Sequence, residues 1–231
     1  MSIAENMAAI RARMARAALA AGRDPAEILL VGASKMNGAA ACREAIAAGI
    51  DALGENRVQE MTAKLAENAY DGAPLHFIGH LQRNKVRQVV GRAALIQSVG
   101  SLELLTEIDR QAEKLSLVQD VLLEVNIGGE ESKSGFAPDG LYAAAETART
   151  FSHVCVRGLM TIPPVEAVPH GNLPYFEKVA QLYVDISRNL YDNGFKYLSM
   201  GMSGDFEDAI SAGATMVRVG SAIFGHRQYQ H

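Results

Sequence analysis

Eight short apolar runs alternate with longer amphipathic stretches from residue 27 onward, and this alternation restricts the fold more than any other feature. Runs such as ILLVGAS (28–34) are apolar almost throughout, as is typical of strands buried on both faces of a parallel sheet. Eight strands alternating with helices predict a closed (β/α)8 barrel of the TIM type, with a doubly wound open sheet as the alternative. The predicted strands are 28–34, 51–55, 75–80, 94–100, 120–127, 154–160, 196–202 and 216–222.

The first segment, residues 2–21, is predicted to be a helix packed against the domain. Ser2 and Glu5 have the S-x-x-E spacing of a capping box. Apolar residues then recur at helical intervals: Ile3, Met7, Ile10, Met14 and Ala17. Helices are expected after strands one to seven, so this helix can complete the outer ring. The 231 residues fit one barrel without a linker, and we expect a single domain over 1–231.

Composition narrows the functional classes. The formal charge of −4 and the pI near 5.9 argue against a nucleic-acid binder, whose surface is basic. No apolar run is long enough to span a membrane. Cys42 and Cys155 lie far apart in no metal-binding spacing, which indicates a reducing compartment and predicts a cytoplasmic protein without a metal site. We expect a monomer.

Polar residues gather where the predicted strands end. In barrels of this kind the chemistry lies at the carboxyl ends of the strands, so these residues predict a binding mouth. They are Lys35, Glu55, Asn56, His80, Ser98, Asn126, Thr161, Ser203, Gly220 and Ser221.

Lys35 follows the first apolar run directly. Lysine in this position can form a Schiff base with a carbonyl group, or it can pair with an anion. The Schiff base needs a neutral amine, and we expect the apolar strand to desolvate Lys35 and lower its pKa. An ordinary solvated lysine is the alternative.

Small residues follow the last two strands, in SMGMSGD (199–205) and VRVGSAIFG (217–225). Barrels often bind phosphate in these loops, at the N-terminus of a short helix. Ser203 and Ser221 offer hydroxyl groups, and the backbone beside Gly204 and Gly220 can approach an anion closely. The alternative is that these residues only form tight turns.

Arg218 lies inside the last predicted strand, two residues before Gly220. Equal parity places both residues on the same side of the sheet, facing the barrel. A buried arginine needs a partner. The candidates are a bound ligand and a salt bridge to Glu55 or Glu124.

Taken together, these residues resemble the YggS/PROSC family of pyridoxal-phosphate-binding proteins, which is similar to the N-terminal barrel of alanine racemase. Met36 and Gly100 depart from the residues usual in that family, threonine and aspartate. The motifs that carry the resemblance are VGASK (31–35), GENRVQE (54–60), LHFIGHLQRNK (75–85), IQSV (96–99), EVNIGGEESKSG (124–135), GLMTIP (158–163), LSMGMSGDFEDAI (198–210) and VRVGSAIFG (217–225).

The resemblance implies pyridoxal 5'-phosphate (PLP) as cofactor, with Lys35 as the Schiff-base lysine. It implies that Ser203, Gly220 and Ser221 hold the phosphate and that Arg218 faces the pyridine nitrogen. Asn56, in the GENRVQE motif, is a further cofactor-binding candidate. A cation opposite the ring nitrogen disfavours ring protonation and so argues against transaminase-like chemistry.

Three functions fit these residues. The first, which the resemblance favours, is a carrier or buffer of PLP that supplies PLP-dependent apo-enzymes, with no assured catalytic residue. The second is a monomeric racemase or lyase that uses Lys35 and His80. The third is a Schiff-base aldolase without pyridoxal that binds a sugar phosphate in the same turns.

Lys133, in the ESKSG segment after the fifth strand, carries a separate hypothesis. A second lysine at a loop near the strand ends can capture the cofactor transiently during loading or release. A solvated loop lysine is the alternative.

Overall fold

The computed structural model describes residues 1–130, 133–164, 166, 168–191 and 194–225. Its eight parallel strands hydrogen-bond in sequence order, and β8 pairs back to β1. This confirms the predicted closed barrel, and the open-sheet alternative is wrong. The strands are β1 (Leu29–Ala33), β2 (Ala52–Glu55), β3 (Leu75–Phe77), β4 (Leu95–Val99), β5 (Gln119–Val125), β6 (Val154–Thr161), β7 (Tyr197–Ser199) and β8 (Met216–Val219).

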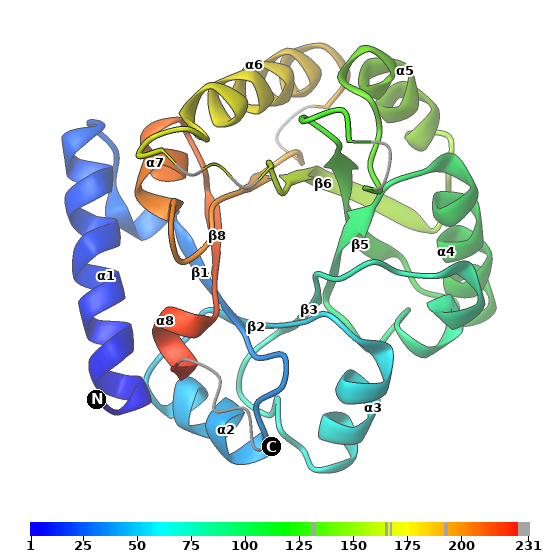
Figure 1. Cartoon of the computed structure of the whole chain (residues 1–231). Coiled ribbons are helices and arrows are strands. Elements are labelled where there is room, and N and C mark those ends of the chain that lie inside the picture. Colours follow the sequence, from blue (N-terminus) through cyan, green and yellow to red (C-terminus); the bar gives the residue numbers. More distant parts are fainter. Residues whose placement is uncertain (131–132, 165, 167, 192–193, 226–231) are drawn as a thin grey trace.

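The helices surround the barrel (Figure 1). The segment after β3 is a 3-10 helix, η2 (Arg83–Gln88), where an α-helix was predicted; only six residues are helical there, and short segments commonly take this tighter form. No helix in the described ranges is long and apolar enough to cross a membrane. The α-helices are α1 (Ile3–Ala20), α2 (Ala39–Ala47), α3 (Val58–Ala66), α4 (Leu102–Lys114), α5 (Pro138–Ala148), α6 (Leu173–Leu190), α7 (Phe206–Ser211) and α8 (Ser221–Phe224), with a further 3-10 turn, η1 (Pro25–Glu27).

The N-terminal helix α1 completes the outer ring. The predicted capping box is present: the Glu5 N–H donates to Ser2 Oγ (3.2 Å), and the Ser2 N–H donates to Glu5 Oε2 (2.8 Å). Met7, Ile10 and Met14 are buried, and α1 packs against α7 and α8, as Figure 1 shows. Because α8 has only four residues, α1 covers the part of the barrel that a longer last helix would cover.

Two apolar clusters form the core, one on each side of the barrel wall. The outer cluster lies between strands and helices and includes Phe77, Phe176 and Phe206, all fully buried. The inner cluster fills the barrel with Val31, Ala52, Leu95, Leu122, Met160 and Met216. The inner layer also contains polar groups: His76 and Gln97 are buried, with His76 Nδ1 and Gln97 Nε2 3.0 Å apart.

His76 should make stability depend on pH in a defined window. Burial lowers the pKa of His76 from 6.5 to about 4. Between these values the unfolded chain binds a proton that the folded chain does not, so stability is lost as pH falls from 6.5 to 4. Relative to His76→Gln, which cannot titrate, the wild type should lose roughly 3 kcal/mol of unfolding free energy over this window. Urea unfolding at a series of pH values measures the difference, and parallel curves for the two proteins would contradict the prediction.

Candidate functional site

A cavity of about 370 Å³ opens at the carboxyl ends of β1, β7 and β8. It brings together five of the six residues predicted to bind the cofactor, together with Gly204. The sixth, Asn56, lines neighbouring hollows instead. The five are Lys35, Ser203, Arg218, Gly220 and Ser221.

Lys35 lies in a turn whose backbone is fixed by hydrogen bonds at the residues before and after it. The Asn37 N–H donates to the Ser34 carbonyl (3.0 Å), and the Asn37 side-chain amide donates to the Lys35 carbonyl (3.0 Å). Met36 adopts a left-handed conformation (φ 63°), and its N–H donates to Glu60 Oε2 (2.7 Å). The backbone is thus fixed while the Lys35 side chain is exposed. The expected desolvation of Lys35 is wrong, because the turn carries it beyond the apolar strand to the open mouth.

A buried ion pair supports this turn from outside the barrel. Glu55, at the end of β2, is fully buried and pairs with Lys64 of α3. Both also bind the residue before Lys35: the Ser34 hydroxyl donates to Glu55 Oε1 (2.5 Å), and Lys64 Nζ donates to the Ser34 carbonyl (2.8 Å). The role of Lys64 could not be predicted from the sequence, because a lysine on an amphipathic helix gives no sign that it is buried.

The turns after β7 and β8 lie side by side. The Gly220 N–H donates to Ser203 Oγ (3.3 Å), and the Ser221 hydroxyl lies 3.4 Å from the same oxygen. Gly201 (φ 90°) begins the first turn, where an added Cβ would lie 2.5 Å from Ala209 Cβ. Two hydroxyls and a backbone amide therefore meet at one point, a donor set suited to an anion.

Arg218 faces the barrel interior, as predicted, and lines the cavity. It is 4% exposed; one terminal nitrogen donates to Ser199 Oγ (2.6 Å) and the other to the Thr161 carbonyl (2.8 Å). Burial lowers the pKa of Arg218 to about 10, against the raising effect of Glu124 and Asp205, so it stays a cation at neutral pH.

The salt bridge considered for Arg218 does not form. Within the described ranges Arg218 contacts no carboxylate at ion-pair distance, and Glu55 faces the opposite side of the wall, where it pairs with Lys64. The positive charge of Arg218 is therefore not cancelled by a direct ion pair and can act on a group in the cavity.

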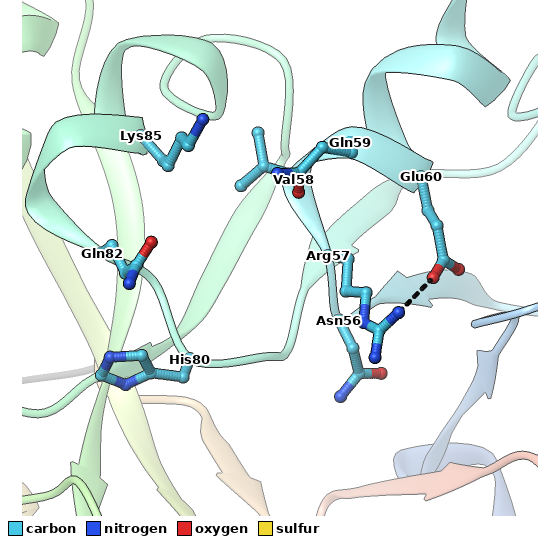
Figure 2. A pocket seen from close by; sticks show the side chains of 8 residues that line it. All are labelled: Asn56, Arg57, Val58, Gln59, Glu60, His80, Gln82 and Lys85. Atoms are coloured by element: carbon cyan, nitrogen blue, oxygen red, sulfur yellow. Dashed lines mark ion pairs between the residues drawn. The ribbon is translucent and has the colours of Figure 1, made fainter.

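A second hollow, of about 520 Å³, lies between the loops after β2 and β3. Figure 2 shows His80 and Lys85 on one side of it and Asn56, Arg57 and Glu60 on the other. Arg57 turns toward Glu60, with nitrogen and oxygen 3.8 Å apart. Asn56 Oδ1 is buried and accepts no hydrogen bond from the residues the structure describes. His80 is exposed and does not line the cavity of Lys35.

Lys133 lines a third hollow, of about 390 Å³, together with Asn56, His80 and Glu124. It forms an ion pair with Glu130, so it is partly neutralised rather than freely solvated. Burial raises the pKa of Glu124 despite a hydrogen bond from Ser134. Lys133 and Lys35 line different hollows, and transient capture by Lys133 stays a prediction.

The two residues that depart from the family pattern have simple surroundings. The Met36 side chain is 63% exposed and lies outside the core. Gly100 lies against the loop after β5, where an added Cβ would be 2.7 Å from the Gly135 nitrogen. A side chain at residue 100 would require this loop to move.

Comparison with known proteins agrees with the fold and extends it. Residues 4–228 match the family model described as alanine racemase, N-terminal domain. Alanine racemase of Clostridium difficile 630 superimposes with a TM-score of 0.70 at 18% identity, over 88% of this chain and 53% of that one, which shows a shared fold. The chain thus belongs to the class of alanine racemase N-terminal barrels.

Full-length relatives define the family more closely. Proteins named pyridoxal phosphate homeostasis protein are 42% identical in Aquifex aeolicus (99% of this chain, 100% of that one) and 43% identical in Pseudomonas aeruginosa (99% and 97%). PipY of Synechococcus elongatus PCC7942, solved with PLP bound, gives a TM-score of 0.83 at 33% identity over 97% of this chain and 100% of that one. The chain belongs to the family of these pyridoxal phosphate homeostasis proteins.

The buried ion pair behind Lys35 should be essential for stability. Lys64→Met leaves Glu55 buried without its partner, and breaking a buried pair in this way costs about 3–5 kcal/mol. Chemical unfolding should show this loss, whereas Lys114→Met, at an exposed position of α4, should stay within about 0.5 kcal/mol of the wild type. Adding Glu55→Gln to Lys64→Met should recover part of the loss. Equal unfolding curves for Lys64→Met and Lys114→Met would refute this role.

Proposed function

We propose that this protein holds PLP as a Schiff base on Lys35 and acts as a carrier or buffer of the cofactor in the cytoplasm. One observation carries the proposal: a single cavity contains an amine, a cation and an anion-binding turn. These groups match the aldehyde, the ring nitrogen and the phosphate of PLP. The relatives named pyridoxal phosphate homeostasis protein and the PLP-bound PipY structure support the same reading.

The residues fit the cofactor in size and chemistry. The cavity volume of about 370 Å³ lies in the range of small-molecule sites. Lys35 Nζ would form a C=N bond with the aldehyde carbon and release water. Ser203, Ser221 and the backbone at Gly220 would hold the phosphate, and Arg218 would face the ring nitrogen. When bound, PLP supplies an aldehyde that condenses with amines.

The arrangement favours storage and delivery over amino-acid turnover. The cation Arg218 opposes protonation of the pyridine ring and so weakens the ring as an electron sink. The alternative racemase or lyase needs His80 beside the substrate, and His80 lines other hollows. A measurement of deuterium exchange at Cα of L-amino acids distinguishes the two functions, because a carrier gives no saturable exchange. We also propose that the protein is a monomer and that it supplies PLP to PLP-dependent apo-enzymes. The activity that such an apo-enzyme regains after mixing with the PLP-loaded protein would measure this supply.

Lys35→Ala should abolish covalent attachment of PLP. Borohydride reduces a Schiff base to a stable amine, so the wild type should gain one cofactor per chain, detected by mass spectrometry, and lose its visible absorbance. Lys85→Ala, which removes a lysine from the second hollow, should label like the wild type. Labelling of Lys35→Ala at the wild-type level would show that another lysine holds the cofactor.

Negative charge in the turns after β7 and β8 should weaken PLP retention. Ser203→Asp and Ser221→Asp each place a carboxylate against the phosphate, and such like-charge contacts should weaken binding at least about tenfold. Ser152→Asp adds the same charge at an exposed position just before β6, at the opposite end of the barrel, and serves as the matched control. Equilibrium dialysis of PLP gives the dissociation constants. If all three variants bind like the wild type, the phosphate site lies elsewhere.

A further inference from the structure

Four buried side chains form a continuous hydrogen-bonded chain across the barrel interior. Arg218 of β8 donates to Ser199 Oγ of β7 (2.6 Å), and the Ser199 hydroxyl donates to Gln97 Oε1 of β4 (2.6 Å). Gln97 Nε2 then lies 3.0 Å from His76 Nδ1 of β3. All four side chains are at most 6% exposed, so water does not compete for these contacts.

The chemistry of the groups fixes the direction of this chain. A guanidinium can only donate, so Ser199 Oγ accepts from Arg218, and the Ser199 hydroxyl in turn donates to the Gln97 carbonyl oxygen. The Gln97 amide nitrogen faces His76 Nδ1 and also lies 3.1 Å from Met216 Sδ. Because an amide nitrogen only donates, His76 Nδ1 accepts. The His76 ring is consequently neutral with its proton on Nε2, in agreement with the lowering of its pKa by burial.

These hydrogen bonds also explain how a cation is tolerated inside the barrel. Among the described residues the Arg218 guanidinium donates only to neutral oxygens, those of Ser199 and Thr161. Neutral acceptors orient the guanidinium and stabilise its charge without cancelling it. The guanidinium keeps further N–H groups, and Arg218 lines the cavity beside Lys35.

We propose that Ser199, Gln97 and His76 are positioning residues for Arg218, holding its guanidinium in the orientation that presents an N–H to the ring nitrogen of PLP. This inference rests on the proposed function of the cavity. It assigns a role to three motifs outside the lysine and phosphate contacts: LHFIGH, IQSV and the LS of LSMGMS. Replacing any of these three residues should change the orientation of the Arg218 guanidinium, even where the replaced residue does not line the cavity.

Two substitutions, Gln97→Leu and Ser199→Ala, test the hydrogen-bonded chain. The matched control is Gln119→Leu, at a buried glutamine elsewhere in the barrel. Gln119 is 3% exposed, lies at the start of β5 and bonds to the backbone at Gly91 and Ala93, outside the chain. Ser199→Ala should weaken PLP binding about tenfold, the loss expected for one hydrogen bond to a charged group, and Gln97→Leu should weaken it in the same direction. Each variant should also shift the visible spectrum of bound PLP. Gln119→Leu should leave both unchanged, and Ser199→Thr, which restores the hydroxyl, should bind more tightly than Ser199→Ala.

Imidazole nitrogen NMR of the cofactor-free protein provides a readout that does not need PLP. The wild type should show His76 as the neutral Nε2–H form with a hydrogen bond at Nδ1. Ser199→Ala does not touch His76, yet it should change this signal by freeing the Gln97 amide. If wild-type protein fails to bind PLP through Lys35, the proposed function fails. If it binds, and Ser199→Ala matches Gln119→Leu in affinity, spectrum and His76 signal, the positioning role is wrong.

Discussion

The pairing of β8 with β1 is the constraint on which the rest of the molecule depends. It aligns Val31 with Arg218 and Gly32 with Val219, so the first and last strands end side by side. Lys35 and Ser221, which are 186 residues apart in sequence, therefore line one cavity. An open sheet with its strands in the same order would leave them at opposite edges. Closure also removes the two exposed strand edges, which would otherwise carry unpaired backbone groups.

The barrel wall separates two kinds of buried polar cluster. Outside the wall, Glu55 and Lys64 cancel each other's charge and anchor the residue before Lys35. Inside the wall, Arg218 is stabilised by neutral groups and keeps its charge. The two clusters therefore have different roles. The outer pair holds the backbone in place, while the inner cation remains available to a bound ligand.

Much of the site could be predicted from the sequence because its residues sit at ends of strands that apolar runs mark clearly. Lys35, Ser203 and Ser221 were placed at one mouth by this rule alone. The rule failed for the surroundings of Lys35: apolar neighbours in sequence predicted a desolvated amine, but the turn from Ser34 to Asn37 carries it to the surface. The 3-10 form of η2 also escaped prediction, since apolar spacing alone does not set helix type or length.

The sequence by itself determined the order of the strands, the residues at their carboxyl ends and the side of the wall that Arg218 faces. These follow from local patterns, namely the period of two along a strand and the alternation of strand with helix. Only the tertiary structure decided which buried groups are partners. The alternation of side chains along a strand does not reveal the register between neighbouring strands, and closure of the barrel sets this register. Arg218 therefore meets Ser199 rather than a carboxylate, and Glu55 meets Lys64.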